Sequence, residues 1–430
     1  MKLFTGRILR HCTAIALSAL LAGAAVSTVL ADDVIKWLHL ENNPVNVKAW
    51  QDIAAAYEAA HPGVKIQFQF LENEAFKAKL PTLLQSNDAP SMFYTWGGGV
   101  LKEQAQTGAI RDVTAAMDAD NGAWRNSISA AAVNGLSFDG KVWAVPTQSG
   151  VVSFFYNKAL FQKAGVDATG IKTWDDFIAA VKKLKAAGIA PIAGGGGDKW
   201  PIHFYWSYLA MRLAGQDGFA AAKAGSDNGF AGEPFVKAGQ LLADLGKLQP
   251  FQDGYLGATW NDTLATFGDG RAAIILSFEN TNFTQASNST DGKGLADDNI
   301  GRFAFPTVAG GKGLVTDDFG GINGWVVTKN APKETEDFLK FLSNPDNERK
   351  QAETFGFLPT TKGAEDGVKN PIVKLAVEQM AKETWHQNYL DQDLGPNVGR
   401  VVNDMSVGIV SGQVSPQDAA QQIQDAMSMQ

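Results

Sequence analysis

The sequence predicts an α/β protein in which helices cover both faces of mainly parallel sheets. Residues 34–40 form an apolar run typical of a strand, and apolar side chains then recur at helical spacing from Val47 to Tyr57. Residues 64–70 alternate between apolar and polar side chains, as in a half-buried strand. A strand, a helix and a second strand in close succession indicate a βαβ unit, which pairs its strands in parallel.

The same pattern returns in the second half of the chain. Thr173 and Asp176 have the spacing of a capping box at the start of a helix, and Gly188 is placed to end that helix. A strand-like segment, 189–193, follows directly. Because a chain of 430 residues is long enough for more than one domain, we expect two α/β units.

Residues 1–31 are expected to be a cleaved signal peptide that directs the protein to the periplasm. Lys2, Arg7 and Arg10 form a basic start, an apolar run follows over 14–30, and Val29-Leu30-Ala31 fits the small-residue pattern before a cleavage site. The alternative is a transmembrane anchor. The run is short for a bilayer span and is interrupted by several polar or small residues, so the signal peptide is the better interpretation.

Composition excludes several functional classes. The only cysteine, Cys12, lies inside the expected signal peptide, so we expect neither disulfides nor thiol catalysis, nor a lipid anchor on a cysteine after the cleavage site. The formal net charge is −8, with 37 basic and 45 acidic residues. An acidic chain without a basic stripe is a poor partner for nucleic acid, and no later segment is apolar enough to embed the protein in a membrane.

Six segments, in chain order, are similar to the family 1 extracellular solute-binding proteins, the maltodextrin-binding type that serves ABC sugar importers. One of them, Tyr156-Asn157-Lys158 and the residues around it, is close to a conserved-looking "YNK" segment of that family. Three departures are Ser91, where the family usually has Asp, Arg271, where it has Lys, and Ile274, where it has Met. The six segments are residues 49–62, 88–93, 155–165, 173–177, 267–273 and 336–347.

This resemblance implies a two-lobed periplasmic binding protein of type II, with the ligand in a cleft at the hinge. It implies a first lobe of residues 32–147 plus 264–312 and a second of 148–263 plus 313–430. It also implies a monomer that binds a carbohydrate, uses no cofactor or metal, and delivers its ligand to the membrane permease subunits of an ABC transporter.

Candidate ligand-binding residues follow from the chemistry of sugars, whose ring faces pack on aromatic rings and whose hydroxyls need paired donors and acceptors. We therefore select tryptophans beside polar or glycine-rich turns, and polar residues where strands end, since ligands bind at the carboxyl edge of such sheets. The candidates are Glu41, Asn42, Asn43, Trp96, Gly97, Gln148, Lys199, Trp200, Trp260, Glu279, Asn280, Asp318, Gly320, Gly321, Asn323 and Trp385. Tryptophans inside apolar patterns are assigned to the core, namely Trp37, Trp50, Trp143, Trp174 and Trp325.

Catalysis is the main alternative to binding. The glycines at 194–197 lack the Lys-Ser/Thr ending of a phosphate loop, and the chain has neither a His-Glu-x-x-His pair nor a Gly-x-Ser-x-Gly elbow. A secreted glycoside hydrolase stays open, because it needs only two facing carboxylates that a sequence cannot place. A sugar-sensing receptor on the same fold stays open as well. We expect a binding protein that is not an enzyme, with a di- or oligosaccharide as its ligand.

Overall fold

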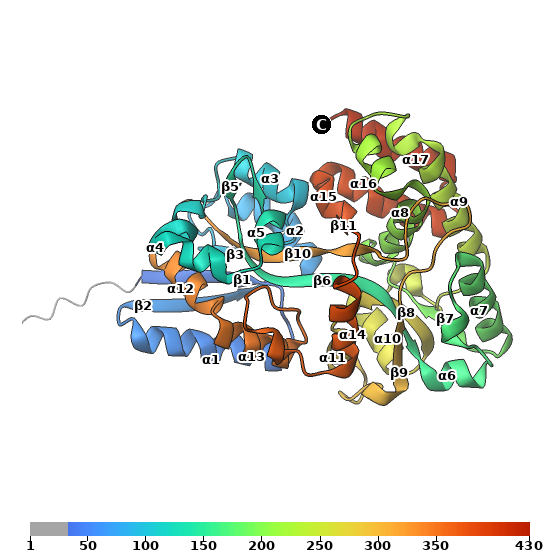
Figure 1. The fold of residues 1–430 in the computed structure, drawn as a ribbon, viewed down its shortest axis with the longest axis horizontal. Coiled ribbons are helices and arrows are strands. Elements are labelled where there is room, and N and C mark those ends of the chain that lie inside the picture. Colours follow the sequence, from blue (N-terminus) through green and yellow to red (C-terminus); the bar gives the residue numbers. More distant parts are fainter. Residues whose placement is uncertain (1–32) are drawn as a thin grey trace, which may run out of the picture.

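Two long strands, β6 (Val145–Asn157) and β10 (Asp317–Val327), run through the middle of the molecule and join two α/β lobes (Figure 1). This computed structural model describes residues 33–430, so the expected signal peptide lies outside the described residues. β6 and β10 pair with each other in antiparallel fashion, with a register irregularity between Asn323 and Gly324. They belong to one sheet with the order β2-β1-β3-β10-β6-β8-β7.

The first lobe contains the βαβ unit that the sequence predicts. β1 (Asp33–His39) and β2 (Val64–Phe70) pair in parallel, and α1 (Pro44–Ala60) connects them. β3 (Met92–Thr95) pairs with β1 on one side and with β10 on the other. The other elements of this lobe are α2 (Asn73–Leu83), α3 (Gly98–Gln106), α4 (Thr114–Ser127), α5 (Ala130–Gly135), β4 (Ser137–Phe138), β5 (Lys141–Val142), α12 (Glu334–Leu342) and α13 (Pro345–Phe355).

The second lobe builds its sheet on the far half of β6. The capping box of Thr173 and Asp176 starts α7 (Trp174–Ala186) as expected, and β7 (Ala190–Ala193) follows and pairs in parallel with β8 (Ala272–Phe278). The remaining elements are α6 (Lys158–Lys163), α8 (Trp200–Lys223), α9 (Glu233–Lys247), α10 (Trp260–Gly268), α11 (Thr281–Asn288), β9 (Ile300–Phe303), α14 (Pro371–Met380), β11 (Trp385–Asn388), α15 (Leu390–Asp393), α16 (Gly395–Val410) and α17 (Pro416–Ser428).

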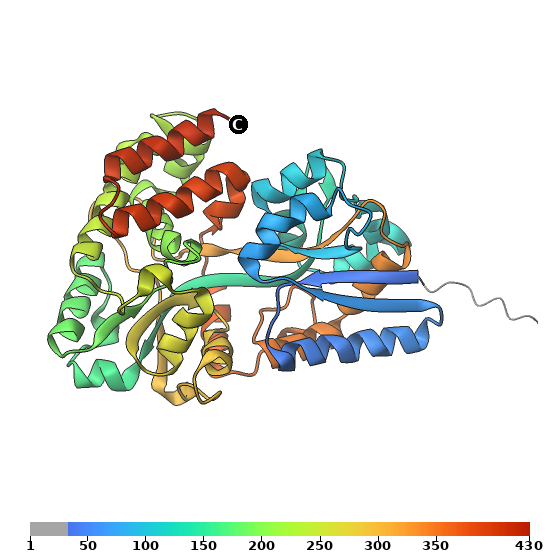
Figure 2. The same ribbon diagram turned by 180° about the vertical axis from the view of Figure 1, so that it is seen from behind.

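Strand pairing corrects the expected lobe boundaries. Residues 264–312 were expected in the first lobe, but β8 and β9 both pair with β6 over residues 152–157, in the second lobe. Conversely, α12 and α13 were expected in the second lobe and pack against α1 in the first. Seen from behind, the strands and helices of residues 260–303 accordingly lie with the second lobe (Figure 2). The chain returns to the second lobe between α13 and α14, which makes this segment a third crossing.

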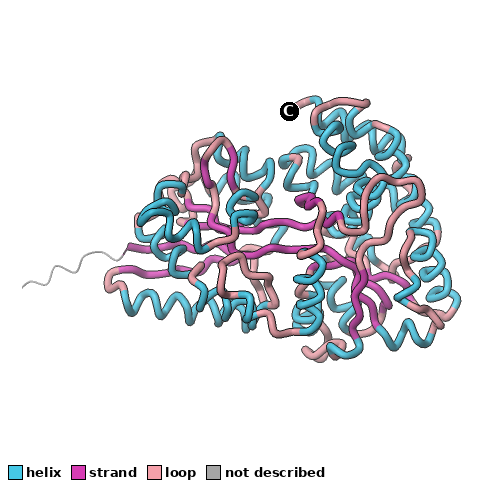
Figure 3. Tube along the Cα trace, in the orientation of Figure 1, coloured by secondary structure: helices cyan, strands magenta, loops and turns pink. Residues whose placement is uncertain are grey.

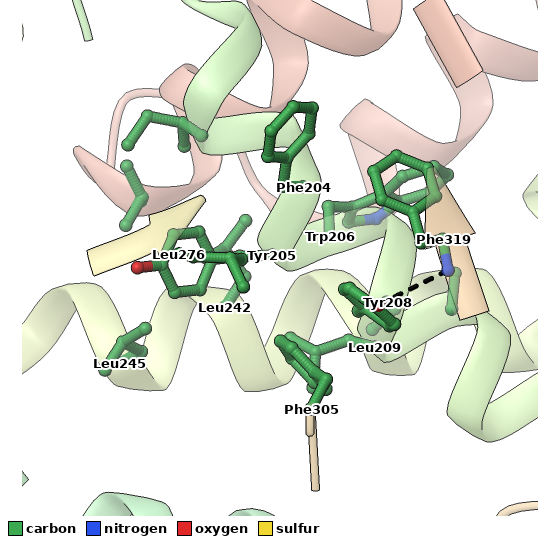
Figure 4. Packing of buried hydrophobic residues seen from close by; sticks show 14 of the residues in the cluster. Phe204, Tyr205, Trp206, Tyr208, Leu209, Leu242, Leu245, Leu276, Phe305 and Phe319 are labelled. Carbon is green, nitrogen blue, oxygen red and sulfur yellow. Dashed lines mark hydrogen bonds between the residues drawn. The ribbon is translucent and has the colours of Figure 1, made fainter. Parts of the chain in front are cut away.

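Each lobe has its own apolar core. The first lobe centres on Trp37, which packs edge-on against Trp325 with ring centroids 5.1 Å apart. The second centres on α8, where Tyr208 stacks on Phe305 at 4.5 Å and its hydroxyl accepts a hydrogen bond from Phe319 N at 3.3 Å (Figure 4). Because the cores are separate, the lobes are joined mainly by the strands that cross between them (Figure 3).

Candidate functional site

A cavity of about 250 Å³ lies between the lobes, where several strands end. Thr95 of β3 and Phe278 of β8 are the last residues of their strands, and the residues that follow them, Trp96 and Glu279, line its walls. The central cavity is lined by Leu40, Glu41, Trp50, Asn73, Lys77, Tyr94, Trp96, Thr147, Gln148, Trp200, Phe204, Trp260, Phe278, Glu279, Asn280, Thr284, Asn323, Trp325, Phe357, Tyr389, Asp391 and Gln392.

The second-lobe wall of the central cavity is a continuous aromatic surface. The ring centroids of Trp200 and Trp260 are 4.9 Å apart, and those of Trp260 and Phe278 are 5.7 Å apart. Phe204 packs against Phe278 at 5.6 Å and lies parallel to Tyr389 at 6.0 Å. The wall therefore offers flat apolar faces to any ring that enters.

The first-lobe wall is also aromatic. Tyr94 contacts Trp96 and Trp325 edge-on, with centroids 5.3 Å away in both cases. Lys77 lies over the Trp96 ring, with its ammonium nitrogen 5.5 Å from the centroid. A ligand held between the lobes would thus meet aromatic rings on two sides.

The floor of the cavity is formed by the crossing strands themselves. Gln148 of β6 and Asn323 of β10 are direct partners across the strand pair. Both are buried, with 9% and 4% of their surface exposed, yet Gln148 Oε1 and Asn323 Oδ1 have no hydrogen-bond partner among the described residues. Trp200 Nε1 in the aromatic wall is likewise buried without a partner there. Leaving such groups unpaired costs stability, so they indicate a polar ligand that pairs with them.

Three carboxyl groups face the central cavity. Glu279 is 1% exposed and accepts a hydrogen bond from Val151 N at 3.2 Å; burial raises its pKa to about 7. Burial also raises the pKa of Glu41, against the effect of the hydrogen bonds that it accepts from Asn46 and from nearby backbone. Burial acts in the same direction on Asp391, but His203, Lys77 and side-chain hydrogen bonds outweigh it and lower the Asp391 pKa.

The central cavity continues into two further hollows. The α3 groove has a volume of about 910 Å³ and shares Lys77, Trp96 and Asp391 with the cavity; it lies between α2 and α3 on one side and α16 on the other. The α11 mouth, of about 160 Å³, opens between residues 41–46 and α11. The three hollows together form a cleft longer than the central cavity alone.

The lobes touch beside the cleft. Asn388 Nδ2 donates a hydrogen bond to Trp96 O at 3.2 Å, and Lys77 Nζ lies 3.7 Å from Asp391 Oδ2. The backbone of α3 comes close to α15, since a Cβ added at Gly98 would lie only 2.7 Å from Asp393 Cα. Gly98 also has a positive φ of 66°, so this approach depends on glycine.

The structure brings most of the sequence-predicted site residues to the cleft. Those that line the central cavity are Glu41, Trp96, Gln148, Trp200, Trp260, Glu279, Asn280 and Asn323. Asn42 and Asn43 line the α11 mouth, and Lys199 lines the α3 groove, where its Nζ pairs with Asp404 Oδ1 at 2.7 Å. Their contact with a ligand stays a prediction.

Five predicted residues are placed elsewhere, which corrects their selection as cavity residues. Trp385 packs on Phe219 at 5.4 Å in the second-lobe core, and Asp318 is fully buried and accepts a hydrogen bond from Gln379. The other three are glycines whose backbone is closely approached by another part of the chain, by backbone at Gly320 and by side chains at Gly321 and Gly97. An added Cβ would lie 1.9 Å from Gly150 O at Gly320, 2.5 Å from Tyr389 Cε2 at Gly321, and 2.8 Å from Leu136 Cδ2 at Gly97.

Sequence reasoning missed several cavity residues. Trp50 and Trp325 were assigned to the core, and they are buried as expected, but they also line the cavity. Phe278 and Tyr389 directly adjoin polar residues at the ends of β8 and β11, so the strand-end signal used for Glu279 could have found them. Asn73, Lys77 and Asp391 lie on helices and carried no such signal.

Two α/β lobes, crossing strands and an aromatic cavity between the lobes define a bilobed ligand-binding protein. The chain belongs to the bacterial extracellular solute-binding protein family, whose model matches residues 42–349. This confirms the resemblance seen in the sequence. It also confirms the expectation of a binding protein rather than an enzyme, because the family is one of solute-binding proteins. Among residues 33–430, no helix has the length and apolar character needed to cross a bilayer.

Similar curated proteins bind different solutes. The chain is 24% identical over 393 residues to the melibiose/raffinose/stachyose-binding protein MelE of Bacillus subtilis, covering 87% of this chain and 84% of that one. It is 27% identical over 355 residues to the sn-glycerol-3-phosphate-binding periplasmic protein UgpB of Yersinia enterocolitica, covering 78% of each. An uncharacterized ABC transporter extracellular-binding protein of Pyrococcus horikoshii is 26% identical over 173 residues, and the match spans only 39% of that protein.

Solved structures with the same fold include a chitin oligosaccharide binding protein, with a TM-score of 0.83 at 21% identity, covering 93% of this chain and 98% of the other. A raffinose complex of the solute-binding protein RafE has a TM-score of 0.73 at 18% identity, covering 92% and 99%. Both likenesses confirm the two-lobed fold.

Proposed function

We propose that the protein is the substrate-binding component of an ABC sugar importer, which captures a di- or oligosaccharide in the cleft between its lobes. The observation that carries this proposal is the pair of aromatic walls on either side of a floor with unpaired amide oxygens. Sugar rings present C–H faces to aromatic rings and hydroxyls to amides, so this cavity matches both surfaces of a sugar. The names of MelE, RafE and the chitin oligosaccharide binding protein support the same class of ligand.

The shape of the cleft supports a ligand of more than one ring. The α3 groove and the α11 mouth adjoin the central cavity on different sides and share residues with it. A single ring in the central cavity would leave both of these extensions unused. A di- or oligosaccharide could occupy the cavity and continue into the groove.

Capture would work by closure of the lobes about the crossing strands. A hinge-closing protein shifts toward its closed state only as far as the ligand binds that state more tightly. Trp200 and Trp260 on one lobe and Trp96 on the other approach each other on closure, so a ring held between them favours the closed state. The closed protein would then deliver the ligand to the permease subunits of the transporter.

The cellular setting that we propose is the periplasm, reached by way of the signal-like residues 1–31, with the protein acting as a monomer. The name of UgpB, a periplasmic protein, supports this location. Mass spectrometry of the exported protein would test it, and a mature N-terminus at residue 32 is the expected result.

A thermal-shift screen of the protein against mono-, di- and oligosaccharides and polyols tests the function. A ligand of the native state stabilises the protein by about 2.7 kcal/mol at a hundredfold excess over its Kd. We expect one saccharide class to raise Tm and to be recovered unchanged after long incubation. Conversion of that sugar would reject the binding function in favour of a hydrolase, and stabilisation by non-sugar solutes alone would reject the sugar.

Matched tryptophan variants locate the binding site. Trp260→Ala removes a ring from the aromatic wall and should weaken binding by about 100-fold, or ~3 kcal/mol, because buried aromatic anchors carry much of the binding energy. Trp143→Ala is the control, since Trp143 stacks on Phe138 at 5.4 Å outside the cavity. Equal losses of affinity in both variants would place the ligand elsewhere.

A further inference from the structure

The charged side chains around the central cavity and the α11 mouth are mostly carboxylates. Glu41, Glu279 and Asp391 line the cavity, and Glu72 and Asp198 line the mouth. Among the described residues, Lys77 is the only lysine or arginine that lines either hollow. This part of the cleft is therefore acidic.

Most of these carboxylates have no cationic partner. Within residues 33–430, no lysine, arginine or histidine lies within 4.0 Å of the carboxylate oxygens of Glu41, Glu72, Asp198 or Glu279. Burial raises the pKa of Glu41, Asp198 and Glu279, which shows that their charged forms are poorly compensated. An additional negative charge beside them would meet repulsion without a counter-ion.

The single lysine is already neutralised. Lys77 Nζ lies 3.1 Å from Glu74 Oε1 and 3.7 Å from Asp391 Oδ2. It also lies over the Trp96 ring. A phosphate or carboxylate group that enters the cavity would have to compete with Glu74 and Asp391 for the ammonium group of Lys77.

Helix N-termini are the usual anion sites of α/β proteins, and the chain's own carboxylates accept backbone N–H groups at the starts of α10, α2 and α1, whereas α8 and α11 begin at the cavity without a side-chain cap. Asp198 Oδ2 accepts from Trp260 N at 2.6 Å, at the first residue of α10. Glu72 caps α2 through Glu74 N at 3.3 Å, and Glu41 Oε1 accepts from Asn43 N, at the cap of α1, at 2.7 Å. A carboxylate therefore already holds a first-turn N–H of α10 and of α2, and an incoming anion would have to displace it.

We propose that these carboxylates select against anionic ligands, so that the solute is an uncharged saccharide and not a sugar phosphate or a uronate. The proposal rests on the proposed sugar function and narrows it to one class of sugar. The proposed ligand class differs from that of UgpB, whose name states an anionic ligand, although the two proteins are 27% identical.

Isothermal titration calorimetry at pH 8.5, where Glu279 with its pKa raised to about 7 is ionised, tests the proposal with matched ligands. One pair is the best uncharged saccharide from the thermal-shift screen and its uronate, in which a carboxylate replaces one hydroxymethyl group; the other is glycerol and sn-glycerol 3-phosphate. We expect the uronate to bind at least about 100-fold more weakly than its uncharged parent, and the phosphate not to bind. Binding of either anion as tightly as its uncharged partner would overturn the proposal.

Two variants test whether the cleft carboxylates cause the weaker binding of the uronate. Glu279→Gln and Asp198→Asn should each reduce the ratio of the Kd for the uronate to the Kd for the uncharged sugar by about 10-fold, whatever their effect on the uncharged sugar itself. Glu233→Gln, which neutralises an exposed residue at the start of α9, is the control and should change neither. The proposal would be overturned if both cleft variants kept the wild-type ratio between the Kd for the uronate and the Kd for the uncharged sugar.

Rejection of the proposed sugar function can be distinguished from rejection of the proposed selection against anions. If no saccharide binds, the proposed function is rejected, and the glycerol pair still decides about charge. Binding of glycerol 3-phosphate would then reject the exclusion of anions as well. Binding of glycerol alone would retain it.

Discussion

Arg212 in the interior of the second lobe and the amides on the floor of the cleft are all buried polar side chains, but their hydrogen bonding differs. Arg212 in α8 is fully buried and donates hydrogen bonds to three backbone carbonyls, Phe305 O, Pro306 O and Asp317 O, at 3.0, 3.3 and 2.9 Å. Gln148 and Asn323 on the floor are nearly as buried and leave their acceptor oxygens unpaired. Burial alone therefore does not mark a binding site. An unpaired polar atom does not mark one by itself either, since within residues 33–430 Tyr205 and Ser207 in α8 also have unpaired buried hydroxyls; the floor amides combine unpaired oxygens with a place in the cavity lining.

The strongest test of this comparison is Arg212→Leu. The substitution leaves three buried carbonyl groups without their donor, so we expect the free energy of unfolding to fall by about 4 kcal/mol. Urea denaturation measures it. Titration of the folded protein should give an unchanged Kd for the sugar. A large loss of affinity without a loss of stability would remove the distinction between the two regions.

The second test uses a buried carboxyl group that has its hydrogen bonds but lies outside the cavity. Glu348 in α13 is 2% exposed and accepts from the backbone N–H groups of Thr360 and Thr361, both at 2.8 Å, yet burial raises its pKa to about 7. The folded protein thus holds a proton that the unfolded chain releases near pH 4.5. The contribution of Glu348 to stability should fall as the pH rises from about 4.5 to 7, by up to ~3 kcal/mol.

Glu348→Gln removes this titration and keeps one acceptor oxygen for the two N–H groups. Relative to the wild type, the variant should be more stable at pH 8 than at pH 5, as measured by denaturation at both values. His39, whose pKa is lowered to about 4 by burial, and Glu279 are present in both proteins and cancel in the difference. A difference that does not vary with pH would show that Glu348 is charged throughout.

The third test concerns the floor. Gln148→Leu replaces an unpaired buried amide with an apolar side chain of similar size, so the free energy of unfolding should change by less than about 0.5 kcal/mol. The affinity for the sugar should fall by about 10-fold, or ~1.4 kcal/mol. Denaturation and calorimetry on the same sample separate the two effects. If stability falls with affinity, Gln148 is a structural residue like Arg212.

The smallest expected effect lies at the contact between the lobes. Lys77→Met removes the ion pair with Asp391 and keeps most of the packing on Trp96, so the sugar affinity should fall about twofold, or ~0.5 kcal/mol. Added salt should weaken binding to the wild type toward the value of the variant. Lys48→Met is the control, because its pair with Asp52 lies on the exposed face of α1. An equal change in both variants would indicate a general charge effect.

Local patterns were sufficient for the predicted elements. The alternation of residues 64–70 and the capping box at Thr173 depend on neighbours in the chain, and the structure has β2 and the start of α7 at those places. The polar residues at the ends of β1 and β8 also lie at the cleft, since the carboxyl edge of a strand is a local property. These features need no knowledge of how the lobes meet.

The predictions that failed depend on contacts between segments that are far apart in the sequence. Trp385 and Trp260 both adjoin polar residues in the sequence, but the first packs on Phe219 of α8 while the second faces the cavity. Trp50 and Trp325 fit an apolar pattern and are buried, but one edge of their cluster faces the other lobe. The lobe boundaries failed for the same reason, because the pairing of β8 with β6 is a long-range contact that no local pattern encodes.

The placement of Gln148 and Asn323 on the crossing strands has a consequence for the order of events in binding. If the lobes rotate about β6 and β10, points on the axis hardly move, whereas Trp96 and Trp260 sweep through an arc. Contacts on the axis are then available to the ligand before and after rotation, and contribute equally to both states. Such contacts hold the sugar but cannot drive the motion; only the rings at a distance from the axis supply the differential affinity that closes the lobes.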